Sequence, residues 1–276
     1  FDMGEGKYHV DWLMRDRAER VCSSYWDVEA SLSKRDKQVA LMIEPNQVVA
    51  TEMEQFRDEP PIQRNPDAGL NVKIVVNFAP QNARSAALQP IDLSALVSIL
   101  RTISREPRIG KFSVVAFNMQ EQRVLYRNDD GDRIDFPAIG QAVTDIKLGT
   151  IDLGRLGQKN ADTDFLANLI RAELQTANTR PDAVIFAGPK AMLNQNISQE
   201  ILKEVGEVNY PVFYMNYNLS PHVVPWRDAI SHAVKHFRGT EYTISQPRDL
   251  WYAVSEMVSH VTKTRVARRT QPQETQ

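Results

Sequence analysis

The chain has 276 residues, of which 42% are hydrophobic and 25% charged, as in an ordinary soluble globular protein. Its 33 basic and 35 acidic residues give a formal net charge of −2. No nucleic-acid partner is expected, because proteins that bind nucleic acids concentrate Lys and Arg to neutralise phosphates. The longest apolar runs have the length of strands, so no transmembrane segment is expected. Cys22 is the only cysteine, which excludes a disulfide within the chain.

Residues 1–50 have the alternating pattern of β strands. In "KYHVDWLM", Tyr8, Val10, Trp12 and Met14 would share one face of a strand. A β segment this short cannot close a core of its own. We therefore expect its apolar face to be covered by the rest of the chain or by another chain.

Residues 51–70 are polar and rich in proline, which predicts a linker. From 71 to 262, apolar strand-sized runs alternate with helical periodicity, which predicts a mostly parallel sheet covered on both faces. Strands are predicted at 72–78, 111–118, 121–127, 182–187, 211–216 and 240–244. Helices are predicted at 91–105, 135–146, 163–177, 198–205, 225–238 and 247–261. The strand at 121–127 follows a tight hairpin and is expected to be an antiparallel edge, and 263–276 is expected to be a disordered tail.

Across residues 71–262, this order of elements resembles the von Willebrand factor A-type domain. "DAVIFAGPK" is similar to the fourth strand of that family, and "PWRDAISHAVKHFRGTEYTISQPRDLWYAVSEMVSHV" to its last helix, strand and helix. With "VDWLMRDRAERVCSSYWDVEA" in front, the whole chain is also similar to secreted bacterial proteins of uncharacterised function that carry such a domain. The resemblance implies a three-layer, doubly wound, Rossmann-like α/β fold with six strands and one antiparallel edge, plus N-terminal β strands.

The resemblance also implies an extracytoplasmic or secreted protein. The chain begins at Phe1 rather than Met, which fits a product whose signal peptide has been removed. A cytoplasmic location is the alternative that the residues leave open.

Many A-type domains bind a divalent metal through an Asp-x-Ser-x-Ser motif after the first strand, a Thr in a second loop and an Asp in a third. The corresponding residues here are Asn77, Ala79 and Gln81 in the first loop, Asp162, Thr163 and Asp164 in the second, and Gly188 in the third. The first and third loops thus lack the acids and hydroxyls that a hard cation requires. We expect a degenerate ion site, with Asp162 or Thr163 capping a helix. A weak site rebuilt from the amide oxygens and the two acids is the alternative.

Asp228, His232 and His236 are spaced four residues apart and would lie on one side of a helix. Paired histidines at this spacing can chelate zinc when a third ligand completes the site. The apolar residues of the same helix form a separate buried stripe, and no Glu follows His232 as in zinc proteases. A solvated histidine face is therefore favoured over a metal site.

These patterns favour a non-enzymatic interaction module that binds a protein or cell-surface partner without a metal or other cofactor. Binding is expected at the loops of the C-terminal edge of the sheet, where α/β folds place ligands. The alternative is a metal-dependent enzyme, a hydrolase, that uses the same crevice with Asp162, Asp164 and the histidines as its ionisable groups.

Overall fold

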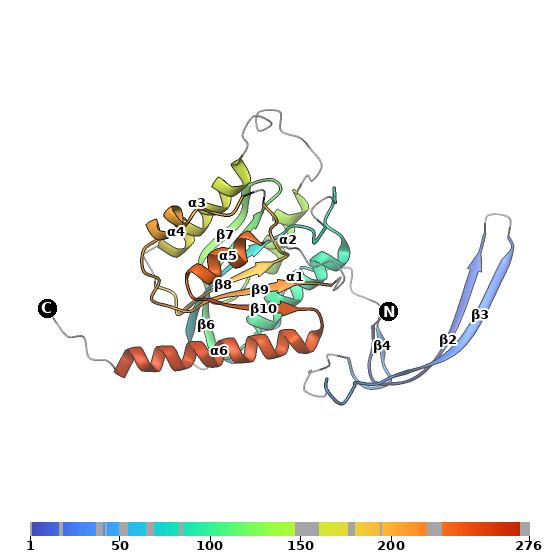
Figure 1. Cartoon of the computed structure of the whole chain (residues 1–276). Coiled ribbons are helices and arrows are strands. Elements are labelled where there is room, and N and C mark those ends of the chain that lie inside the picture. The colour runs from blue at the N-terminus through green and yellow to red at the C-terminus, as the bar shows by residue number, and fades with distance from the viewer. Residues whose placement is uncertain are drawn as a thin grey trace. The chain divides into compact units, whose positions relative to one another are not determined.

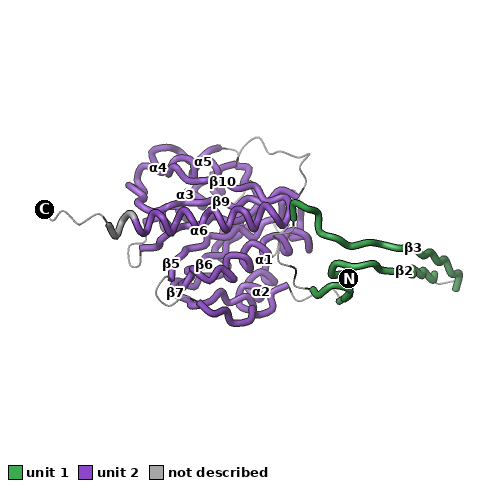
Figure 2. The backbone as a smooth tube through the Cα atoms, turned by 90° about the horizontal axis from the view of Figure 1, so that it is seen from below, with its two compact units in different colours: residues 1–54 green, residues 55–276 purple. Residues whose placement is uncertain are grey.

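The computed structural model describes residues 2–16, 19–36, 41, 43–49, 55–64, 69–82, 85–146, 160–175, 180–193, 195–219 and 228–270, with side chains up to 266. The chain divides into two compact units, residues 1–54 and 55–276 (Figure 2).

The N-terminal unit is built from strands, as its alternating sequence predicts. β2 (Gly6–Arg15) and β3 (Val21–Ala30) form an antiparallel ribbon in which Gly6 lies opposite Ala30 and Arg15 opposite Val21. Two short strands, β1 (Asp2–Met3) and β4 (Val48–Val49), pair with each other. The ribbon positions Tyr8, Val10 and Trp12 on one face, in the register that strand geometry requires.

The second unit contains a six-stranded sheet with the order β10-β9-β8-β5-β6-β7 (Figure 1). Its strands are β5 (Leu70–Asn77), β6 (Ile109–Asn118), β7 (Arg123–Gly131), β8 (Ala183–Gly188), β9 (Val212–Tyr217) and β10 (Thr240–Ile244). All neighbouring pairs are parallel except β6 and β7, which form the antiparallel edge. The prediction of a mostly parallel α/β sheet with one antiparallel edge strand is confirmed.

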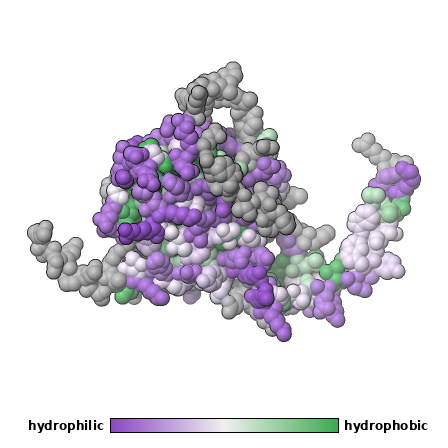
Figure 3. Space-filling model, viewed as in Figure 1, coloured by the Kyte–Doolittle hydropathy of each residue, from purple (hydrophilic) through white to green (hydrophobic). Residues whose placement is uncertain are grey.

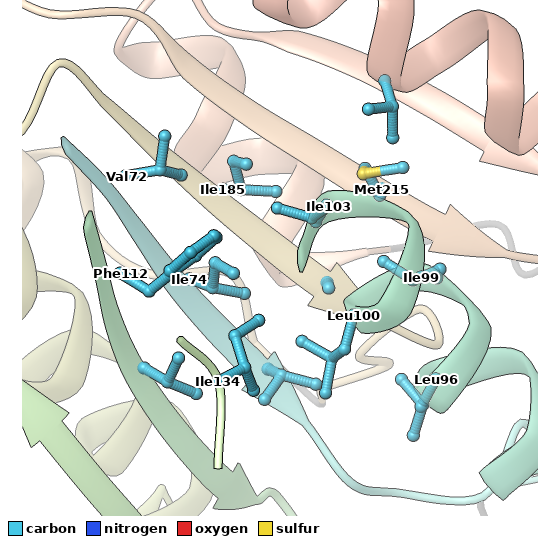
Figure 4. Packing of buried hydrophobic residues seen from close by; sticks show 14 of the residues in the cluster. Val72, Ile74, Leu96, Ile99, Leu100, Ile103, Phe112, Ile134, Ile185 and Met215 are labelled. Carbon is cyan, nitrogen blue, oxygen red and sulfur yellow. The ribbon is translucent and has the colours of Figure 1, made fainter. Parts of the chain in front are cut away.

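Helices cover both faces of this sheet. α1 (Pro90–Ser104), α2 (Phe136–Thr144) and α6 (Pro247–Thr270) enclose one apolar cluster. α3 (Ala161–Gln175), α4 (Gln199–Glu204) and α5 (Ala229–His236) enclose another. Along β5, Ile74 belongs to the first cluster and Val75 to the second, because successive side chains of a strand point to opposite faces. Figure 4 shows part of the first cluster, in which Leu96, Ile99, Leu100 and Ile103 of α1 lie over strand residues that include Ile74 and Ile185.

The last helix is longer than its sequence predicts. α6 continues to Thr270, so the prediction of a disordered tail is wrong for residues 263–270, while 271–276 lie outside the described residues. Among the side chains of α6 that the structure describes, Val261 is the last that is buried. Arg265 supplies a polar anchor instead: its Nη1 donates to the Gly69 carbonyl at 2.7 Å and lies 3.7 Å from the Asp182 carboxylate.

Part of the predicted linker is packed on the α/β unit. Residues 55–64 form no helix or strand, as expected. However, Glu59 forms ion pairs with Arg101 and Arg105 of α1 and its C-cap, at 2.8 and 2.6 Å. Arg64 donates to the carbonyl groups of Ser104 and Ile109, and its guanidinium lies 4.8 Å from the centre of the Phe112 ring. These contacts make residues 55–64 an arm that belongs to the α/β unit.

Candidate functional site

The C-terminal ends of the parallel strands meet at one edge of the sheet. From β5 the chain passes through α1 to β6 on one side, whereas from β8 it passes through α4 to β9 on the other. The loops after β5 and β8 therefore diverge at neighbouring strands, which is where open α/β sheets place their ligands. Asn77 and Gly188, which the sequence analysis assigned to the first and third loops, are the last residues of these two strands.

The end of β5 is in close contact with the end of β8. Asn77 is 1% exposed, and its Oδ1 accepts a hydrogen bond from the Met119 backbone N–H at 3.2 Å. Gly188 has φ of +143°, and a Cβ added there would lie 2.8 Å from the Asn77 Cβ and 3.0 Å from its carbonyl oxygen. The position that the resemblance assigns to an acid thus has room for glycine alone.

The first loop is held by hydrogen bonds within the protein. Ala79 is buried, and its carbonyl accepts from the Tyr217 hydroxyl at 3.2 Å. The Gln81 side chain donates to Asn218 Oδ1 at 2.9 Å and accepts from the Leu219 N–H at 3.0 Å. The amide oxygen that a rebuilt ion site would need is therefore already engaged, in joining the loops after β5 and β9.

Asp92 is a buried carboxylate at this edge that the sequence analysis missed. Its Oδ1 accepts from the Gln81 N–H and the Tyr217 hydroxyl, each at 3.1 Å, and its Oδ2 accepts from the Gln89 N–H at 3.1 Å. Burial, with the Asp92 charge as a further cause, raises the pKa of Tyr217, which keeps this phenol a donor. The sequence "QPID" contained a signal for Asp92. In a capping box, an acid at the third helical position accepts from the N–H of the N-cap residue, and here these residues are Asp92 and Gln89.

The second loop differs from the prediction. α3 begins at Ala161, two residues before the predicted start, so Asp162 and Thr163 lie in the first turn and neither is the N-cap. Thr163 is buried, and its hydroxyl lies 3.4 Å from the Gln195 carbonyl. Asp164 is exposed. Two acids in the first turn suit the positive end of the helix dipole, which explains their presence without a metal.

No group of three His, Cys, Asp or Glu side chains that could hold a metal ion occurs within the described ranges. Of the proposed zinc ligands, Asp228 caps α5: its Oδ1 accepts from the N–H groups of Ile230 and Ala191, both at 3.1 Å. His236 is exposed and contacts the Phe237 ring edge-on. His232 departs from the predicted solvated face, because it is half-buried and its Nδ1 is buried without a hydrogen bond.

Burial raises the pKa of Asp228 to about 6. Hydrogen bonds from the backbone N–H groups of Ala191 and Ser231 act in the opposite direction and favour the carboxylate. Its Oδ2 is buried without a hydrogen bond. The residue is thus an unusual ionisable group near the candidate edge, although its other oxygen has a structural role.

Two large apolar side chains are exposed at the same edge of the sheet. Ile91 lies in the first turn of α1, after the β5 loop, and is 59% exposed; Met192 follows β8 and is 48% exposed. Most of the surface of the α/β unit that Figure 3 shows is hydrophilic. The sequence analysis missed both residues, whose only signal is an apolar residue in a polar loop, in "QPID" and "AMLNQ".

No protein-family model and no curated protein matches this chain. Among solved structures, it is similar to a point mutant of the PilB minor pilin from Streptococcus sanguinis, at 10% identity and a TM-score of 0.38 over 77% of this chain. Another is crystal form 2 of proximal thread matrix protein 1 from the mussel byssus, at 11% identity and a TM-score of 0.40 over 73% of this chain. The chain spans 65% and 47% of the lengths of those two proteins. Similarity at this level carries no conclusion about function.

In the part of the chain that the structure describes, every helix is too short or too polar to cross a bilayer.

Proposed function

We propose that this chain is a non-enzymatic interaction module whose second unit is a divergent von Willebrand factor A-type domain with a degenerate ion site. The strand order supports this proposal. Counted from β5, the sheet has the order 6-5-4-1-2-3 with the third strand antiparallel, a doubly wound arrangement. An extracytoplasmic or secreted location is part of the proposal and rests on the sequence resemblance alone.

The proposed binding surface is formed by the loops after β5 and β8, and the observation that carries it is the contrast between their polar and apolar side chains. The side chains of Asn77, Gln81 and Asp92 each form hydrogen bonds within the protein, while Ile91 and Met192 remain exposed. Apolar side chains in a polar surrounding are typical of protein-binding surfaces. A protein or cell-surface partner that contacts Ile91 and Met192 directly would need no metal.

A metal-dependent hydrolase is the second candidate. The raised pKa of Asp228 favours it, because perturbed ionisable groups gather at catalytic sites. Catalysis requires several such groups within hydrogen-bond reach in one pocket. The cap role of Asp228 and the internal hydrogen bonds of Gln81 and Asp92 favour binding over catalysis.

Titration with Mg²⁺ and Mn²⁺ tests the absence of an ion site. We expect no saturable heat in calorimetry over about 10⁻⁷ to 10⁻³ M, the range that sensor-like and extracellular ion sites cover. A site built from neutral amide oxygens lacks the Coulomb attraction that offsets the dehydration of Mg²⁺. Saturable binding that is lost in Asp162→Ala or Asp164→Ala would show a rebuilt site and would favour the metal-dependent candidate.

A further inference from the structure

The β2–β3 ribbon is amphipathic across its two faces. One face consists of Tyr8, Val10, Trp12 and Met14 with, opposite them, Val28, Trp26, Ser24 and Cys22. The other face carries the charged side chains of the ribbon together with three exposed apolar ones, Leu13, Val21 and Tyr25. There His9 bonds to Asp27 at 2.8 Å and approaches Asp11 at 3.4 Å. Among the described residues, ten of the sixteen large hydrophobic side chains that are exposed belong to the N-terminal unit. This unit is therefore where an apolar surface needs a partner.

The two strands of the ribbon also have unpaired edges. In the described part of the chain, β2 and β3 pair along ten residues with each other alone. A two-stranded ribbon is marginal in water, and three or more strands with an apolar face are needed for stability. An open strand edge of this length is a template for another strand.

We propose that two copies of this chain associate through the free edges of their β2 strands, in an antiparallel register centred on Val10. The proposal is independent of the function proposed above. In an antiparallel pair, residues that lie directly opposite each other point to the same face of the sheet. Possible registers therefore differ by a shift of two residues, which moves the centre of the pair by one residue. Charges then distinguish between them.

In the register centred on Val10, nine residues overlap and His9 of each copy lies opposite Asp11 of the other, which makes two attractive pairs. The hydrogen bond to Asp27 raises the pKa of His9, which favours its charged form. Centring on Asp11 would oppose the two Asp11 carboxylates and would place Lys7 against Arg15. Centring on His9 would also make two attractive pairs, Lys7 with Asp11, but it would oppose the two His9 side chains on the axis and overlap only residues 6–12. Centring on Trp12 would place His9 against Arg15.

The edge of β3 is the weaker choice. Its only charged residues are Asp27 and Glu29, so no register of two β3 strands contains an attractive pair. Pairing of β2 with β3 of a second copy would leave free edges and continue into a polymer, whereas the symmetric β2 pair closes as a dimer.

The resulting four-stranded sheet would have the order β3-β2-β2-β3 and a continuous apolar face. Val10 lies opposite Trp26 within the ribbon, so a row Trp26–Val10–Val10–Trp26 would cross all four strands. In the next row, Tyr8 of one copy would lie opposite Trp12 of the other. Aromatic and β-branched neighbours are the pairs that stabilise a sheet.

Sedimentation of the full chain over a range of concentrations tests the association. We expect a weak, concentration-dependent dimer, because edge pairing buries less than the roughly 1,200 Å² at the low end of standard interfaces. Val10→Asp places two like charges on the symmetry axis and should weaken the dimer about tenfold. Leu13→Asp is the matched control, because the new carboxylate lies opposite Lys7 of the other copy, and it should leave the dimer intact.

Disulfide cross-linking in a Cys22→Ser background tests the register. Val10→Cys should give covalent dimers on mild oxidation, and a mixture of His9→Cys and Asp11→Cys chains should give mixed dimers. Lys7→Cys should give no covalent dimers. In this register Lys7 lies opposite Leu13 of the other copy, so the two Lys7 positions are about 20 Å apart at 3.4 Å per residue. The proposal would be overturned if the chain were a monomer at every concentration, if it formed open-ended polymers, or if Val10→Asp and Leu13→Asp had equal effects. It would also be overturned by dimers that cross-link through Val10→Cys but never as the mixed pair of His9→Cys and Asp11→Cys chains. The last result would indicate packing between apolar faces.

Discussion

Replacing Glu173 with Ala is expected to lower the free energy of unfolding by about 3–5 kcal/mol, because it leaves a buried charge without its partner. Glu173 is on α3, and its side chain is fully buried against Lys73 of β5, which is itself 7% exposed. Lys73 Nζ lies 3.2 Å from both the Glu173 carboxylate and its backbone carbonyl. Arg127 of β7 donates to the same carboxylate from a more exposed position.

Chemical denaturation with two control variants isolates this effect. Glu204→Ala removes an exposed ion pair with Arg171 and should change stability by less than about 1 kcal/mol. Lys73→Met should cost less than Glu173→Ala, because Glu173 would keep Arg127. If Glu173→Ala costs no more than Glu204→Ala, the ion pairs of Glu173 with Lys73 and Arg127 do not hold α3 on the sheet.

Gly188→Ala is the second substitution expected to have a large effect, about 2–6 kcal/mol of lost stability. The φ of +143° strains any L side chain by about 1–3 kcal/mol. A Cβ there also meets Asn77, whose backbone cannot move without shifting β5, and overpacking of this kind costs about 1–3 kcal/mol.

Gly206→Ala is the matched control for Gly188→Ala. Gly206 also has a positive φ, +80°, but nothing lies within 4 Å of the position that its Cβ would occupy. It should therefore show backbone strain alone, about 1–2 kcal/mol. Equal losses in the two variants would contradict the close approach of Gly188 and Asn77.

The order and type of the elements in the α/β unit could be read from the sequence because their signal is local. The buried run of β8 and the helical periodicity of α1 each span one element, and β7 was recognisable from its hairpin. Contacts between distant residues have no such signal. Arg265, 196 residues from Gly69, extends α6 past its apolar stripe, and Arg64 packs a proline-rich stretch that looks like a linker.

The sequence predicts where β5 and β8 end, but not the contacts that the residues there make. The loop positions of Asn77 and Gly188 follow from the strand pattern. Whether Gln81 is free to bind depends on Asn218, which is 137 residues away, and so cannot be judged from the loop alone. Exposure of Ile91 and Met192 likewise depends on what the fold leaves uncovered.

Photo-cross-linking from the proposed edge tests the central claim most directly. A photoreactive amino acid is placed at Ile91, at Met192 or, as a control, at the exposed Glu207 between α4 and β9, at the opposite edge of the sheet. Each protein is irradiated with the native envelope fraction of the producing cells, with and without EDTA. We predict the same discrete adduct from Ile91 and Met192, none from Glu207, and no change with EDTA. Three results would contradict metal-independent recognition through the loops after β5 and β8. They are adducts from Glu207 alone, no discrete adduct from any position, and an adduct from Ile91 or Met192 that EDTA abolishes.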